Sequence, residues 1–211
     1  MLASKDNILP IFFGWLALKL CTESALVKTI GTKLTAFEPP TGRQAKPCVL
    51  KLAPELLPKG DEGLLPSEYE KTIRKIKYGV LYKPAVTNFP LVDVFFFSVS
   101  NPMTLVALRM TTAGGHHTTV STVRQFTECL AAYCNGWEES SRDMSWEIIY
   151  VQRADSTPMN DRQRCDVFNS NNNTDAEHCE IAAFWREKVR QYPVLILSGD
   201  IGRDKAFRSE K

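Results

Sequence analysis

The sequence predicts a single α/β domain built on a mixed β-sheet. Two dense apolar runs, Phe89–Ser100 and Met103–Thr112, flank the turn residues Asn101 and Pro102, which is typical of a strand hairpin. A segment with helical spacing and then a third apolar run, Met144–Gln152, follow along the chain. A hairpin followed by a helix and a further strand indicates a mixed sheet, because the helix crossover brings the last strand back in parallel.

The composition suits one globular domain with its own core. The chain has 211 residues, of which 44% are hydrophobic and 24% are charged. The formal net charge of +2 does not predict general electrostatic capture of nucleic acid, although it leaves room for a local basic patch. The six cysteines contain no CxxC pair and no zinc spacing, so we expect reduced thiols that mostly fill the core.

Changes in composition along the chain predict three regions. Residues 1–47 combine an apolar opening with turn residues that show no clear period, and we expect them to form an atypical arm. The main α/β domain is expected over residues 48–198. Residues 199–211 are charged and are expected to form a frayed tail.

The apolar opening, Ile8–Leu18, does not predict a membrane span. It is shorter than the roughly 18–20 apolar residues that a spanning helix needs. Asp6 lies in the segment before it and Pro10 interrupts it, which argues against a secretory signal. We therefore expect neither a membrane span nor a true secretory signal in this segment.

Two helices are predicted from capping boxes, in which a Ser or Thr precedes a Glu by three residues. Ser67 with Glu70 predicts a helix that ends at Gly79, after a turn-rich hinge over Lys59–Pro66. Thr174 with Glu177 predicts a later helix, after a polar loop. The inward residues of this later helix are expected to be Ile181, Phe184, Trp185 and Val189.

A third helix and a last strand complete the predicted elements. The segment from Ser121 repeats apolar residues at helical spacing and is expected to end at Gly136. The short apolar run Tyr192–Leu197 predicts a final strand. The polar loop before the last helix extends over Arg153–Asn173.

Asp93 is the most informative residue for chemistry. It lies inside an apolar run, where a carboxylate is costly unless it is paired, hydrogen-bonded or bound to a metal. The next strand carries Arg109 and Thr111, which are two apart and therefore share one face. One interpretation is a structural ion pair between Asp93 and Arg109 across the hairpin. The other is a metal site.

The predicted element order resembles the core of restriction-endonuclease-like nucleases, which implies a three-layer core with flanking helices. In those enzymes, an Asp on one strand and an acidic or amide residue plus a Lys on the next hold a divalent metal over a phosphate. Asp93 fits that pattern, and Glu70 on the preceding helix would join it. Arg109 and Thr111 stand where the other two residues are expected. Mg²⁺ or Mn²⁺ at Asp93 is thus the only candidate cofactor, at a weakened site.

His116 and His117 lie at the predicted turn between the second strand and the helix. Adjacent residues on an extended segment point to opposite sides, so the two are not expected to bind one metal. His117 is the candidate catalytic base, since histidine titrates near neutral pH. The plainer alternative is that the pair ends the strand and helps to cap the helix.

Long segments of the chain, such as "TLVALRMTTAGGHHTTVSTVRQFTECLAAYCNGW" and "DAEHCEIAAFWREKVRQY", resemble the C-terminal part of the retrotransposon hot spot (RHS) proteins of trypanosomes. The resemblance extends from about Leu50 to Tyr192. Family members usually carry an upstream P-loop module, whose motif this sequence lacks, so a truncated copy without ATPase activity is expected.

The resemblance implies a location in the nucleus or the cytoplasm and a role in chromatin- or RNA-related processes. Together with the weakened site, it predicts a degenerate nuclease-like domain that acts through contacts with nucleic acid or with chromatin- and RNA-associated proteins. The candidate residues for nucleic-acid binding are Arg109, Arg124 and Arg164. Two alternatives stay open: an active metal-dependent nuclease that uses Asp93, Glu70 and His117, and the non-functional product of a pseudogene.

Overall fold

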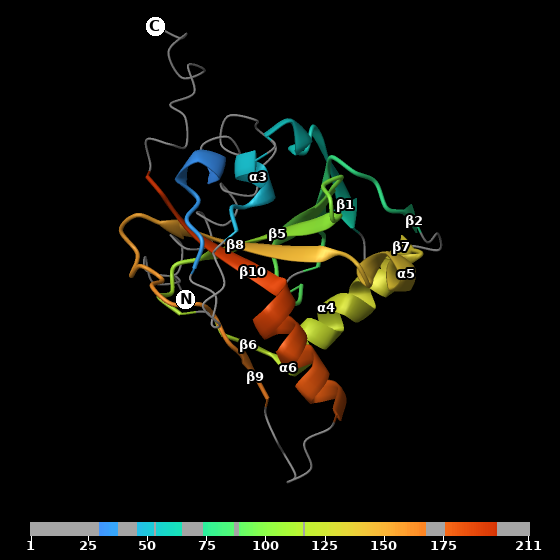
Figure 1. The fold of residues 1–211 in the computed structure, drawn as a ribbon. Coiled ribbons are helices and arrows are strands. Elements are labelled where there is room, and N and C mark those ends of the chain that lie inside the picture. Colours follow the sequence, from blue (N-terminus) through green and yellow to red (C-terminus); the bar gives the residue numbers. More distant parts are fainter. Residues whose placement is uncertain are drawn as a thin grey trace, which may run out of the picture.

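The fold is built around a mixed six-stranded sheet with the strand order β1-β3-β4-β5-β8-β10 (Figure 1). The computed structural model describes residues 30–37, 46–52, 54–64, 74–86, 89–115, 117–167 and 176–197. The six strands are β1 Gly60–Leu64, β3 Val80–Pro84, β4 Val94–Ser98, β5 Thr104–Thr111, β8 Ser145–Arg153 and β10 Val189–Ile196. The sequence-based prediction of an α/β domain with a mixed sheet is confirmed.

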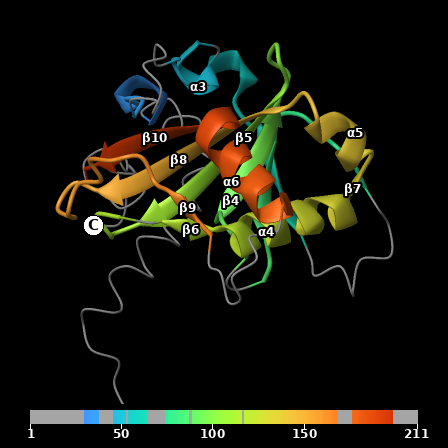
Figure 2. The same cartoon turned by 60° about the horizontal axis from the view of Figure 1, so that its bottom comes forward.

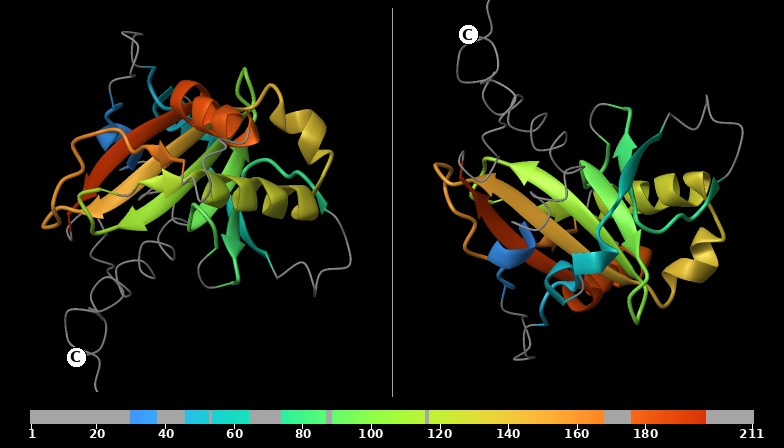
Figure 3. Two further views of the ribbon diagram at one scale, coloured as in Figure 1. Left: turned by 90° about the horizontal axis from the view of Figure 1, so that it is seen from below. Right: turned by 90° about the horizontal axis from the view of Figure 1, so that it is seen from above.

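The centre of the sheet follows the predicted order. Strands β4 and β5 form the expected antiparallel hairpin. Strands β5, β8 and β10 are parallel neighbours, and helices connect them: α4 (Val120–Tyr133) leads to β8, and α6 (Ala176–Lys188) leads to β10. Both helices cover the same face of the sheet (Figures 2 and 3), as two successive crossovers of one hand require.

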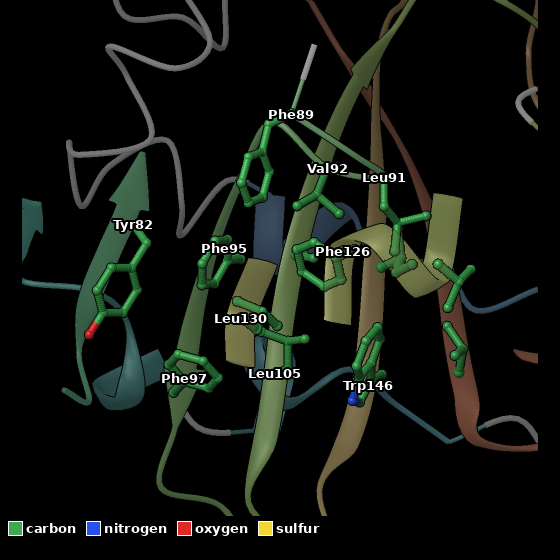
Figure 4. Packing of buried hydrophobic residues seen from close by; sticks show 14 of the residues in the cluster. Tyr82, Phe89, Leu91, Val92, Phe95, Phe97, Leu105, Phe126, Leu130 and Trp146 are labelled. Carbon is green, nitrogen blue, oxygen red and sulfur yellow. The ribbon is translucent and has the colours of Figure 1, made fainter. Parts of the chain in front are cut away.

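Aromatic side chains fill the space between the sheet and these two helices. Phe126 of α4 packs edge-on against Phe95 and Trp146, with ring centroids 5.8 and 5.5 Å apart (Figure 4). Trp146 also meets Phe184 of α6 at 5.1 Å. Such edge-to-face pairs add to the stabilisation that burial alone supplies. This face therefore holds the larger part of the core.

The opposite face of the sheet is covered by shorter segments (Figure 3). Residues 30–33 are helical, and Ile30 and Leu34 are buried against the sheet although they belong to the expected N-terminal arm. The helix α3 (Val49–Leu52) and the 3-10 turn η1 (Pro54–Leu56) follow. The central strands are thus buried on both faces.

The prediction of a helix ending at Gly79 is wrong over its last part. Arg74–Lys75 form the strand β2, which pairs in parallel with β7 (Cys134–Asn135). Gly79 has a φ of 68° and accepts a hydrogen bond from the N–H of Lys59 instead of ending a helix. Ser67 and Glu70 lie outside the described residues.

Strands β1 and β3 were not predicted. Strand β1 occupies the segment expected to be a hinge, and it is a sheet edge with mostly exposed residues. Ion pairs join it to its neighbours: Asp61 lies 2.6 Å from Lys83, and Glu62 lies 2.8 Å from Lys77. An edge strand of this composition has no apolar alternation, so its sequence carries no strand signal.

The remaining predicted elements are confirmed with shifted ends. The helix expected from Ser121 begins at Val120 and ends at Tyr133, while Gly136, with a φ of 73°, precedes the short helix α5 (Trp137–Ser141). Helix α6 buries Trp185 as expected, but Val189 already belongs to β10. None of the helices within the described ranges is long and apolar enough to cross a membrane.

Glu147 of β8 fastens the segment around α3 to the sheet. Its Oε2 accepts hydrogen bonds from the Cys48 thiol at 2.9 Å and from the Val49 N–H at 3.0 Å. Its Oε1 lies 3.1 Å from the Arg190 guanidinium. Burial raises the pKa of Glu147, against the opposing effects of Cys48, Arg190 and Val49, which lower it.

We predict that Glu147→Gln changes how stability depends on pH. Because the pKa of Glu147 is higher in the folded chain than in the unfolded one, the folded state binds this proton more tightly. Its stabilising contribution is complete below the unfolded pKa, about 4.3, and is lost as pH rises through the folded pKa. Urea unfolding between pH 4 and 8 should show the wild type losing stability relative to Glu147→Gln as pH rises.

The matched control is Glu180→Gln on the exposed surface of α6. This variant should follow the wild-type pH profile. A constant difference between wild type and Glu147→Gln across the whole pH range would contradict the prediction.

Candidate functional site

The candidate site lies at the carboxyl ends of the parallel strands β5 and β8. Arg109 of β5 and Tyr150 of β8 are partners in the strand register, so their side chains share a face. That face is the one covered by α4 and α6, since the neighbouring inward residues pack with these helices. Ligands in α/β sheets commonly bind outside the carboxyl ends of the strands.

Asp93 and Arg109 form the ion pair that was one of the two interpretations of the sequence. The Arg109 guanidinium donates to Oδ1 of Asp93 at 3.1 Å, and the N–H of Met110 donates to Oδ2 at 2.7 Å. Both charged side chains are roughly three-quarters buried, with 25% and 30% exposed. These contacts supply the partners that a carboxylate at this position requires.

A predicted metal site at Asp93, Glu70 and His117 is not assembled by the described part of the chain. Glu70 and His116 lie outside the described residues. Among the residues that are described, no three His, Cys, Asp or Glu side chains gather closely enough to hold a metal ion. Mg²⁺ or Mn²⁺ binding at Asp93 therefore stays a prediction.

His117 connects the start of α4 to the long loop after β8. Its Nδ1 accepts a hydrogen bond from the Arg164 N–H at 3.2 Å, and the N–H of Thr118 donates to the Arg164 carbonyl at 2.9 Å. Two short strands, β6 (Thr118–Thr119) and β9 (Cys165–Asp166), continue this pairing. A neutral imidazole whose Nδ1 accepts a hydrogen bond carries its proton on Nε2. The His117 side chain is exposed.

Threonine hydroxyls surround the N-terminus of α4. Thr119 is the N-cap, and its Oγ1 accepts from the N–H of Thr122 at 3.2 Å. The Thr119 hydroxyl also lies 2.8 Å from that of Ser121 and 2.9 Å from that of Thr122. The N-terminus of a 14-residue helix carries a partial positive charge, so this end of α4 favours an anion.

The side chains at these strand ends and the start of α4 enclose a cavity of about 220 Å³. Tyr150 is only 2% exposed, and burial raises its pKa, against the lowering effects of Arg162 and Arg109. The phenol is therefore a neutral donor. The residues that line the cavity are Leu91, Arg109, His117, Thr118, Thr119, Thr122 and Tyr150.

The loop after β8 is held against α6 and β10. Arg162 donates to the carbonyls of Trp185, Arg186 and Val189 at 2.9, 3.0 and 2.5 Å, which satisfies the C-terminal end of α6. Gln191 exchanges two hydrogen bonds with the backbone of Gln163, at 2.8 and 3.0 Å. These contacts fix the loop that supports His117.

Gly114 allows the same loop to approach the end of β5. A Cβ atom at this position would lie 2.8 Å from Cγ2 of Thr157, which is closer than real Cβ contacts. Gly114 thus permits a close approach of two loops.

The three arginines predicted to bind nucleic acid occupy different surroundings. Arg109 lines the cavity. Arg164 is 73% exposed beside the cavity rim, where its Nε lies 4.0 Å from Asp166. Arg124 is half-buried on α4, and its Nε lies 2.9 Å from Glu177 of α6. Arg109 therefore belongs to the site, Arg164 contacts its rim through the backbone, and Arg124 joins two helices.

Tyr150 and Arg162 were missed in the sequence. Tyr150 lies within an apolar run, and only its register with Arg109 places it in the cavity. Arg162 belongs to a loop with no periodic pattern. In the sequence, the local indication of a site residue was a tyrosine hydroxyl near the end of a predicted buried strand.

Comparisons with known proteins identify no relatives: no protein-family model, no curated protein and no solved structure matches the chain. The resemblance of Leu50–Tyr192 to RHS proteins therefore stays a prediction from the sequence.

We predict that Asp93→Ala destabilises the fold by about 1–3 kcal/mol, because it removes the carboxylate that accepts from the largely buried Arg109 guanidinium and from the Met110 N–H. Urea unfolding at neutral pH measures the change. Asp61→Ala, which removes an exposed ion pair to Lys83, is the control and should cost about 0–1 kcal/mol. Equal midpoints for the two variants would contradict a structural role for the Asp93 pair.

Proposed function

We propose that this domain binds nucleic acid through phosphate groups at the cavity between β5, β8 and the start of α4, and that binding rather than strand cleavage is its activity. The observation that carries the proposal is the position of Arg109, whose guanidinium lines the cavity beside the N-terminus of α4. Arginine and a helix N-terminus are both common partners of phosphate oxygens.

The local charges support an anionic ligand. The pair of Arg109 with Asp93 adds no net charge, but it holds the guanidinium in one place. Arg162 adds a positive charge that lies close enough to Tyr150 to lower its pKa. The helix N-terminus adds a further partial charge, so the cavity has an excess of positive potential.

The wider proposal is a restriction-endonuclease-like core that has lost its metal site. Its support is the hairpin of β4 and β5, followed by the crossover through α4 to β8. Asp93 precedes β4, and Arg109 and Thr111 stand two apart on β5, where such nucleases carry a metal ligand and a lysine. The sequence resemblance to RHS proteins is in keeping with a role in chromatin- or RNA-related processes.

We predict that Arg109→Gln weakens binding to single-stranded DNA and lowers the salt dependence. Losing one phosphate contact should reduce the slope of log affinity against log salt concentration by about one. Fluorescence anisotropy with a labelled oligonucleotide at several salt concentrations measures both quantities. Measuring Arg109→Gln also in the Asp93→Asn background, against Asp93→Asn alone, isolates the loss of the guanidinium from the loss of its ion pair with the carboxylate.

Arg142→Gln is the matched control, because Arg142 is exposed and precedes β8 at its opposite end. Tyr150 of the cavity is the sixth residue of β8, so five strand steps of about 3.3 Å, roughly 17 Å, separate the start of the strand from the cavity. Loss of binding in this control but not in Arg109→Gln would overturn the proposed location.

Asp93→Asn separates the binding function from the nuclease alternative. At a binding site, removing a negative charge beside Arg109 should strengthen DNA binding about five-fold, as expected for roughly 1 kcal/mol between charges 4 Å apart in water. At a nuclease site, the same change should abolish cleavage in the presence of Mn²⁺. Plasmid cleavage by the wild type that Asp93→Asn lacks would therefore replace the binding proposal with the enzymatic one.

A further inference from the structure

We infer that the cavity binds the terminal phosphate of a nucleic-acid strand rather than an internal phosphodiester. This inference rests on the proposed function and specifies which phosphate the site takes. It is carried by the size of the cavity, by two buried hydroxyls that line it and by the depth at which they lie.

The cavity is too small for a whole nucleotide. Pockets for drug-sized ligands measure about 300–1,000 Å³, and this one measures about 220 Å³. It has room for a phosphate group with the adjoining part of a sugar. A base would stay outside, so we expect no preference for base sequence at this position.

Two hydroxyl-bearing side chains line the cavity, and one of the hydroxyls has no hydrogen-bond partner in the described structure. Thr118 is 8% exposed, and its Oγ1 has no hydrogen-bond partner in the described structure. Tyr150 is 2% exposed and lines the same cavity, where burial keeps its hydroxyl a neutral donor. Buried polar groups are rarely left unpaired, because each costs about 1–3 kcal/mol. A ligand with several acceptor oxygens would pair both.

The position of these hydroxyls in the inner part of the cavity favours the end of a nucleic-acid strand over an internal phosphodiester. Tyr150, Thr118 and Leu91 are buried, whereas His117, which lines the same cavity, is exposed, so we place the first three in the inner part and His117 at the rim. An internal phosphodiester carries a sugar on each side and would need an open groove to reach the inner part. A terminal phosphate carries one substituent and can enter with its free oxygens first.

Charge adds to this selection. A terminal phosphate carries about −1.5 to −2 at neutral pH, compared with −1 for a phosphodiester. The excess positive potential comes from Arg162 and the start of α4, with Arg109 balanced by Asp93. Asp166 opposes it at the rim, since it pairs in register with Thr119. A phosphate with the higher negative charge is therefore attracted most strongly in the inner part of the cavity.

The test compares one labelled single-stranded oligonucleotide in 5′-hydroxyl, 5′-phosphate and 3′-phosphate forms by anisotropy. We expect at least one phosphorylated form to bind about ten-fold more tightly than the hydroxyl form, the size expected for one hydrogen bond to a charged group. Tyr150→Phe should remove most of this preference with an unchanged melting temperature. Thr118→Val is the second variant, and it should act in the same direction without loss of stability.

The outcomes distinguish the inference from the function on which it rests. Equal binding of all three forms, with Arg109→Gln still weakening it, would overturn the terminal-phosphate inference and leave nucleic-acid binding in place. No binding of any form would overturn both. A mononucleoside monophosphate that binds as tightly as the phosphorylated strand would show that the ligand is a free phosphomonoester. An unchanged preference in both Tyr150→Phe and Thr118→Val would also overturn the inference.

Discussion

The burial of β5 and β8 on both faces is the constraint from which the rest of the structure follows. Alternating apolar residues of these strands belong to two separate clusters, one under α4 and α6 and one under α3 and residues 30–37. A parallel pair buried in this way needs a crossover helix between its strands, and α4 is that helix. The same connection brings the N-terminus of α4 to the carboxyl ends of the strands. The position of the cavity is thus a consequence of how the core is buried.

The ion pair of Asp93 and Arg109 stabilises the fold and also holds the guanidinium in place for the proposed phosphate contact. A half-buried guanidinium without a partner would be mobile or would draw in water, whereas the Asp93 carboxylate and the Met110 N–H fix one geometry. A fixed guanidinium loses less conformational entropy when it binds a phosphate. The carboxylate lowers the attraction for an anion at the same time. The balance between these two effects sets the affinity of the site.

The sequence predicted those elements whose residues bury a regular apolar pattern. The hairpin, α4, β8 and α6 each carry such a pattern, as the spacing of Val123, Phe126 and Leu130 illustrates. Strands β1 and β2 carry charged and exposed residues, and their pairing depends on distant partners that no local pattern reveals. The pairing of Asp93 with Arg109 was one of two interpretations, because facing hairpin positions can be counted from the turn. Tyr150 and Arg162 were missed, because strand register and loop docking place them.

The two-residue ladder between β6 and β9 has a consequence for the order of folding. It joins Thr118 to Cys165 across 47 positions of the chain, and the loop that supplies β9 is itself held by Gln191 on the last strand. Contacts of such long sequence separation carry a high loop-closure cost and tend to form late. The hairpin with Asp93 and Arg109 consists of local contacts and can form early. The wall of the cavity around His117 would then form only when β10 docks. The site is therefore complete only in the fully folded protein.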